Sequence, residues 1–115
     1  MTARRQIRLT TRGRQSGQPR SVTLFAWPDG ETLVVVGSAG GSARHPAWAL
    51  NLRANPAAEV QEGKLQRAVR TREPEGTERE RLWLLVTEAF PLYATYQRRT
   101  SRTLPLFVLE DAPPQ

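Results

Sequence analysis

Cysteine is absent from this chain of 115 residues, and histidine, lysine and methionine each occur once. The absence of cysteine excludes disulfides, iron–sulfur clusters, thiolate zinc sites and a cysteine nucleophile. It also fits a protein of the reducing cytosol. We expect one domain over residues 1–115, in which residues 1–5 are flexible and residues 111–115 form a frayed tail.

Long apolar segments are also missing. No run of about 18 apolar residues is present, so we expect no membrane-spanning helix. The basic N-terminal segment is not followed by an apolar stretch, so it does not match a secretion signal. These absences predict a cytoplasmic protein that is at most peripheral to a membrane.

The single histidine leaves little room for catalysis by side chains alone. His45 lies in a loop before a proline and has no partner at metal-ligand spacing, so we interpret it as structural and expect no metal site. The GxSxG, GxxxxGK[ST] and GxGxxG motifs are absent. The carboxylates occupy turns, a helix and the tail rather than apolar runs that would raise their pKa values. If the protein is an enzyme, a bound cofactor must therefore supply the chemistry.

Acidic residues are missing from the start of the chain, where Asp29 is the first of them. Six arginines precede it: Arg4, Arg5, Arg8, Arg12, Arg14 and Arg20. The later basic and acidic residues balance, so the net charge of +6 belongs to the N-terminal segment. Arginine forms bidentate contacts with phosphate and carboxylate. The cluster therefore indicates either a local anionic partner or a solvated basic segment.

Six short segments have the alternation or composition of strands. The predicted strands cover residues 6–11, 21–27, 32–36, 58–62, 65–72 and 104–109. The first three form an antiparallel meander with a turn at Pro28-Asp29-Gly30, and the next two form a hairpin about Gly63-Lys64. The run TLVVV at 32–36 is apolar throughout, which is typical of a central strand.

Two helical segments interrupt the strands. The first follows Pro46, which suits the first turn of a helix, and ends at Asn55-Pro56. The second begins at a capping box, Thr77-Glu78-Arg79-Glu80, and continues with an apolar stripe: Leu82, Leu85, Val86, Ala89 and Phe90. A further helical turn after Pro91 places Tyr93 and Tyr96 on one face.

The element order is βββ-α-ββ-α-β, which is mainly β with a few helices (α+β). Six short strands with sparse helical cover predict a small closed or partly open barrel. A flat sheet of this size would leave long edges exposed.

Two glycine-containing loops have the composition of anion-binding sites. Residues 12–20, RGRQSGQPR, combine two glycines with arginines, so their backbone N–H groups can form a concave nest. Residues 37–42, GSAGGS, leave the central strand for a helix N-terminus, where free N–H groups favour phosphate or ring carbonyls. The alternatives are a solvated basic hairpin for the first loop and a plain turn for the second.

Four polar or aromatic residues accompany these loops. Trp48 and Asn51 lie one helical turn apart, and Trp48 either covers a flat ring or belongs to the core. Tyr93 and Tyr96 either line a substrate mouth or are half-buried packing residues with wet hydroxyls.

Three segments carry a family resemblance over nearly the whole chain. They are LTTRGRQSGQPRSVTL, LVVVGSAGGSARHPAWALNLRANP and FPLYATYQRRTSRTLPLFVLE. Together they resemble the deazaflavin (F420)-dependent nitroreductases, also called F420H2-dependent quinone reductases, from Leu9 to Glu110. The G-R-x-[ST]-G-x-x-R and N-L-x-A-N-P motifs are the most specific. The resemblance implies a split β-barrel of the flavin-reductase, FMN-binding type.

It also implies binding of reduced coenzyme F420, an 8-hydroxy-5-deazaflavin, and hydride transfer to a quinone, nitroaromatic or other activated acceptor. The cofactor's phosphodiester and oligoglutamate tail are expected at Arg14, Gln15, Ser16 and Arg20. The deazaflavin is expected along Val36, Ser38 and Ala39, beside Trp48 and Asn51. The acceptor is expected at Phe25 and Phe90, with Tyr93 and Tyr96 as catalytic residues. The proton is expected from Tyr93, from Tyr96 or from solvent.

The chain departs from the family pattern at two of these positions. Gln15 stands where the family often has lysine, and we expect Arg12 to compensate for that charge. Phe90 stands where a tyrosine is common, which removes a possible proton donor.

Three other functions are compatible with the sequence. The same barrel could hold FMN, or the protein could bind the cofactor as a carrier without turnover. It could also be a small basic nucleic-acid-binding module. The resemblance favours a small-molecule acceptor and no nucleic-acid partner. We expect the protein to be a monomer or a homodimer.

Overall fold

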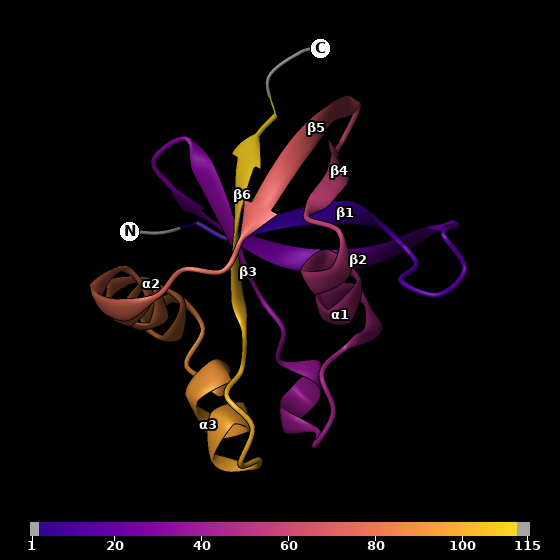
Figure 1. Ribbon diagram of the computed structural model, residues 1–115. Coiled ribbons are helices and arrows are strands. Elements are labelled where there is room, and N and C mark those ends of the chain that lie inside the picture. The colour runs from indigo at the N-terminus through magenta and orange to yellow at the C-terminus, as the bar shows by residue number, and fades with distance from the viewer. Residues whose placement is uncertain (1–2, 113–115) are drawn as a thin grey trace.

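The computed structural model describes residues 3–112, which form a closed antiparallel barrel. Its strands are β1 (Arg5–Arg12), β2 (Pro19–Asp29), β3 (Thr32–Val36), β4 (Ala57–Glu62), β5 (Leu65–Arg72) and β6 (Leu106–Asp111). They are hydrogen-bonded in the order β1-β2-β3-β6-β5-β4, and β4 returns to β1 through pairs such as Leu9 with Val60. The predicted barrel, meander and hairpin are confirmed (Figure 1).

Two strands, β3 and β6, are apolar on both faces because each separates two cores. Leu33 and Val35 of β3 point into the barrel with Phe107 and Leu109 of β6. The alternate residues of both strands belong to a second core on the outside: Val34, Val36, Leu106 and Val108. The continuous apolar run of β3 is therefore explained by burial on both sides.

The helices cover one end and one side of the barrel. They are the 3-10 turn η1 (Ala39–Gly41) and the helices α1 (Ala47–Ala54), α2 (Gly76–Ala89) and α3 (Leu92–Arg98). Helix α1 contributes Trp48, Ala49 and Leu52 to the barrel interior. Helices α2 and α3 lie outside the barrel (Figure 1). Their residues Leu82, Val86 and Tyr93 belong to the same core as the outward residues of β3 and β6. No helix in residues 3–112 is long and apolar enough to cross a membrane.

The predicted capping box at the start of α2 is wrong. The helix begins at Gly76, its N-cap is Glu75, and no side-chain capping hydrogen bond is present. Thr77 therefore lies inside the first turn instead of before it. The carboxylate of Glu78 accepts two hydrogen bonds from Arg72 of β5 instead, at 2.7 and 2.9 Å. An ion pair with β5, and no side-chain cap, therefore stabilises the first turn of α2.

Several strand boundaries also differ from the prediction. β2 continues through Pro28 to Asp29, because Asp29 pairs with Thr32, and the turn falls at Gly30 with φ of +61°. β6 begins two residues later than expected and extends to Asp111, which pairs with Val69. Proline at position 105 has no N–H to donate to a ladder, which explains the later start.

Both ends of the described chain join the barrel. Arg5 already pairs with Ala26, and the Ala112 N–H donates a 3.0 Å hydrogen bond to the Ala68 carbonyl. The remainder of the segments expected to be flexible or frayed, residues 1–2 and 113–115, lies outside the described residues.

The barrel wall is split along one edge of β2. Residues 19–26 of this strand pair with β1, whereas pairing with β3 is confined to residues 27–29. In the described part of the chain no strand pairs with the second edge of residues 19–26. Backbone polar groups along this edge are therefore available, and the split places them beside α1 and the loop that follows β3.

Candidate functional site

Two cavities lie along the split edge of β2. The first, of about 420 Å³, is lined by Gly13, Arg14, Gln15, Ser16, Arg20, Ser21, Val22, Ala47, Trp48 and Asn51. The second, of about 400 Å³, is lined by Gln6, Thr23, Leu24, Phe25, Val36, Ser38, Gly40, Phe90, Tyr93 and Tyr96. Every predicted site residue except Ala39 lines one of the two. The structure therefore brings together the positions that the sequence singled out and divides them into a basic group and an aromatic group.

The basic loop that borders the first cavity is a closed turn. The Gly13 N–H donates to the Gln18 carbonyl and the Gly17 N–H donates to the Gly13 carbonyl, both at 2.8 Å. Gly17 has φ of +72°, which favours glycine. The Arg12 guanidinium donates to the Gly17 carbonyl at 2.9 Å and lines a different hollow. The expectation that Arg12 replaces the charge missing at Gln15 is therefore wrong, since its side chain holds the loop closed.

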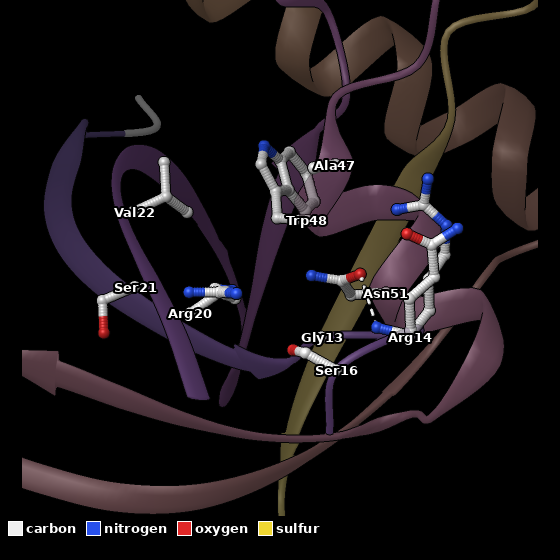
Figure 2. A pocket seen from close by; sticks show the side chains of 10 residues that line it. Gly13, Arg14, Ser16, Arg20, Ser21, Val22, Ala47, Trp48 and Asn51 are labelled. Carbon is white, nitrogen blue, oxygen red and sulfur yellow. Dashed lines mark hydrogen bonds between the residues drawn. The ribbon is translucent and has the colours of Figure 1, made fainter. Parts of the chain in front are cut away.

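The Asn51 side chain connects this loop and β1 to α1 through two hydrogen bonds. Its Nδ2 donates to the Thr11 hydroxyl at 3.1 Å. Its Oδ1 accepts from the Arg14 backbone N–H, also at 3.1 Å (Figure 2). The Asn51 side chain is buried, so these bonds are shielded from water. Thr11 was not predicted as a site residue, although it continues the inward alternation of Ile7 and Leu9 along β1.

Replacing Asn51 with alanine is expected to lower the free energy of unfolding by about 1–3 kcal/mol, because the buried Thr11 hydroxyl and the part-buried Arg14 N–H lose their partner. The measurement is urea denaturation, with Asn55→Ala as the control. Asn55 makes a similar side-chain hydrogen bond to a backbone N–H, that of Ala57, but at an exposed site. An equal decrease in the free energy of unfolding for both variants would contradict the proposed role of Asn51 in anchoring the loop.

The cations of the first cavity have no carboxylate partners. The ion pairs within residues 3–112 all lie elsewhere, and the first cavity has no acidic lining residue. Figure 2 shows Arg20 of β2 and Arg14 of the loop on either side of Asn51. Two unpaired guanidinium groups and the Ser16 hydroxyl form a donor set suited to an anion.

Trp48 is mainly a core residue. Only 8% of it is exposed, and its ring packs edge-on against Phe107 at 5.8 Å between centroids. It nevertheless contributes to the lining of the first cavity, beside Val22 and Ala47. Of the two interpretations of Trp48, the core role is present, and the exposed remainder provides an apolar wall.

The second cavity is walled by an aromatic cluster. The centroid of the Phe90 ring lies 4.8 Å from that of Tyr93, 6.1 Å from that of Trp27 and 6.3 Å from that of Phe25. Phe25 is partly exposed, and the Arg4 guanidinium lies 4.5 Å above its ring. This wall is suited to a flat, apolar molecule.

The two predicted catalytic tyrosines differ in environment. The Tyr93 hydroxyl accepts a 3.1 Å hydrogen bond from the Trp27 indole N–H, and the residue is buried. Burial raises the pKa of the Tyr93 phenol, although the Trp27 bond opposes this rise. Tyr93 therefore remains protonated at neutral pH. Tyr96 is less buried, and the Arg99 guanidinium lies 5.5 Å from its ring centroid.

The loop after β3 has an unusual backbone. Ala39, Gly40 and Gly41 have φ of +44°, +62° and +81°, so three successive residues adopt left-handed conformations. Ser38 and Gly40 line the second cavity, whereas Ala39 is exposed beside them. Positive φ is uncommon for alanine, and such conformations are concentrated at functional sites.

Arg102, which the sequence did not single out, contacts this loop and His45. Its Nη1 donates to His45 Nδ1 at 2.9 Å, so His45 is the neutral tautomer with a proton on Nε2. Burial lowers the pKa of His45, and the positive charges of Arg102 and Arg53 lower it further against the opposing effect of Glu73.

The unfolded chain consequently binds a proton at His45 more readily than the folded chain does. The free energy of unfolding therefore keeps its full value above pH 6.5, the ordinary pKa of histidine. It decreases as the pH falls toward the lower pKa of His45 in the folded protein. We expect the melting temperature to decrease as the pH is lowered from neutral through this range. In His45→Gln the decrease is expected to be smaller, and an identical pH dependence in both proteins would contradict this prediction.

Comparison with known proteins gives a consistent result. Residues 1–111 match the family model described as F420H(2)-dependent quinone reductase. An F420H(2)-dependent quinone reductase of Mycobacterium tuberculosis is 38% identical over 104 residues, which cover 88% of this chain and 70% of that protein.

Two solved structures share the fold and a substantial part of the sequence. One, described as an F420-H2 dependent reductase, is 40% identical with a TM-score of 0.82, over 91% of this chain and 93% of that chain. The other, described as a domain-swapped dimer, is 40% identical with a TM-score of 0.83, over 91% of this chain and 79% of that chain.

Proposed function

Because this chain belongs to the F420H(2)-dependent quinone reductase family, we propose that it transfers a hydride from reduced coenzyme F420 to a quinone. The observation that carries the proposal is the pairing of a basic cavity with an aromatic one along the split edge of β2. An anionic cofactor with a flat ring requires both kinds of surface. The relatives do not favour the FMN or nucleic-acid alternatives.

The donor set of the first cavity fits the anionic part of such a cofactor. Arg14 and Arg20 form no ion pair within residues 3–112, and Asn51 holds the loop that carries Arg14. These residues, with Gln15 and Ser16, would hold the phosphodiester and the oligoglutamate tail. Charge-assisted hydrogen bonds of this kind are stronger than neutral ones.

The second cavity fits the flat ring and the acceptor. Val36 and Ser38 would lie along the deazaflavin together with Ala39, and Phe25 and Phe90 would contact the acceptor. When bound, reduced F420 supplies the hydride, and the acceptor takes up that hydride and a proton. The residues of this chain orient the two molecules and exclude water, and the proton comes from a tyrosine of the second cavity or from solvent. The aromatic wall does not select for a quinone, so we extend the proposal to nitroaromatics.

The direct test is to mix the purified protein with reduced F420 and a water-soluble naphthoquinone, and to record oxidised F420 by its fluorescence. We expect oxidation that depends on both protein and quinone. A parallel assay with a nitroaromatic tests the wider acceptor range, and reduced FMN is the comparator. Oxidation with reduced FMN but not with reduced F420 would overturn the cofactor assignment, and no binding of F420 at low salt would overturn the proposal.

The two tyrosines are expected to respond differently to removal of the hydroxyl. Tyr96→Phe should lower kcat about 10²-fold or more if this phenol supplies the proton, with little change in the Kd for F420. Tyr93→Phe should lower the melting temperature, because the buried Trp27 N–H loses its acceptor. Stopped-flow turnover and thermal melting separate the two effects. An unchanged kcat in Tyr96→Phe would assign proton delivery to Tyr93 or to solvent.

A further inference from the structure

Arg102 forms four hydrogen bonds with the loop after β3. Its Nε donates to the Ser42 carbonyl at 2.8 Å, and its Nη2 donates to the Ser38 carbonyl at 2.8 Å. Its Nη1 donates to the Gly37 carbonyl at 3.0 Å and to His45 at 2.9 Å. All three guanidinium nitrogens are thus engaged by a single segment, residues 37–45, which forms one wall of the second cavity.

These bonds fix the orientation of two successive peptide units. In a planar trans peptide the carbonyl and the following N–H point in opposite directions. Since Arg102 binds the carbonyls of Gly37 and Ser38, the N–H groups of Ser38 and Ala39 point away from Arg102. Neither N–H donates a backbone hydrogen bond within residues 3–112, whereas the Ser38 carbonyl accepts a second bond from the Gly41 N–H at 2.8 Å.

The guanidinium also places a positive charge behind these N–H groups. No carboxylate within the described residues forms an ion pair with Arg102, so its charge is balanced by carbonyl dipoles and the His45 ring. A cation behind two aligned N–H groups increases their attraction for an electronegative atom. Lysine could not reproduce this arrangement, because its ammonium lacks the planar fork of donors.

We propose that Arg102 is a positioning residue of the reductase, which holds the N–H groups of Ser38 and Ala39 ready to bind electronegative atoms of the cofactor ring in the second cavity. The proposal rests on the proposed function, because it assumes that a ring binds at this wall. Arg102 itself does not contact the ring.

The test compares Arg102→Lys with Arg44→Lys, which changes an exposed arginine of the same segment. Without any ligand, hydrogen exchange of residues 37–45, measured by mass spectrometry, is expected to accelerate in Arg102→Lys alone. With reduced F420 and naphthoquinone, Arg102→Lys should lower kcat about tenfold or more, because small misplacements in an active site are costly. The KM for the quinone should change much less than kcat, and Arg44→Lys should match the wild type in all three measurements.

A measurement on the wild-type protein covers the case in which Arg102→Lys does not fold. On addition of F420, the amide proton resonances of Ser38 and Ala39 should move downfield, whereas that of Arg44 should move little. Unchanged resonances of Ser38 and Ala39 in a protein that binds F420 would overturn the proposal, as would unchanged exchange or unchanged kcat in a folded Arg102→Lys. If the wild type does not bind F420 at all, the proposed function fails and the positioning role falls with it, whereas the exchange experiment still reports whether Arg102 holds the loop.

Discussion

Arg20→Ala is expected to raise the Kd for coenzyme F420 about 10- to 150-fold, which corresponds to a charge-assisted hydrogen bond of roughly 1.5–3 kcal/mol. Arg20 lines the first cavity and forms no ion pair in the described part of the chain, so its positive charge is available to the ligand. Arg14→Ala should act similarly, although the Arg14 backbone N–H retains its bond to Asn51.

Arg8→Ala is the matched control for this prediction. Arg8 belongs to the same N-terminal arginine cluster and is exposed, but it lines a separate hollow beside Gln61 and Gly63. The two variants have the same net charge, so a general electrostatic attraction would weaken equally in both. Fluorescence titration at several salt concentrations distinguishes the two cases. Equal Kd values for Arg8→Ala and Arg20→Ala would show that the first cavity does not hold the anion.

The parts of the fold that were predicted correctly depend on short-range patterns. The apolar run of β3 and the two-residue turn at Gly63-Lys64 are local signals, and both are confirmed by the register. The inward residues of β1 follow from simple alternation. Such patterns predict the fold reliably because the burial of one or both faces of a strand is already visible in its own sequence.

The contacts that hold the site together have no such local signal. Asn51 and Thr11 are 40 residues apart, and Arg102 binds a segment 57 to 65 residues before it. Only the closed barrel brings these side chains together. The capping box failed because α2 begins at Gly76 with Glu75 as its N-cap, so Thr77 lies inside the first turn. The sequence therefore predicts the surfaces of the site better than the hydrogen bonds that fix them.

Gly41→Ala is expected to destabilise the protein by roughly 2–5 kcal/mol, from a left-handed backbone that disfavours alanine together with overpacking. Gly41 has φ of +81°, and a Cβ there would lie 2.7 Å from the Tyr96 carbonyl oxygen and 3.0 Å from the Tyr96 Cα. Both neighbours are backbone atoms of α3, so relief requires the loop and the helix to separate. Because Tyr96 and Gly40 both line the second cavity, that separation should widen it and lower turnover as well as stability.

Gly40→Ala isolates the steric part of this effect. Gly40 has φ of +62°, so alanine meets a similar backbone penalty, but a Cβ there has no neighbour within 4 Å. Urea denaturation should therefore place Gly40→Ala between the wild type and Gly41→Ala. The difference between the two variants measures the contact of the loop with α3. Suppose that both variants lose the same stability and that Gly41→Ala retains full turnover with reduced F420. Close packing of the loop against α3 then does not shape the cavity. The left-handed backbone alone would account for the glycine at this position.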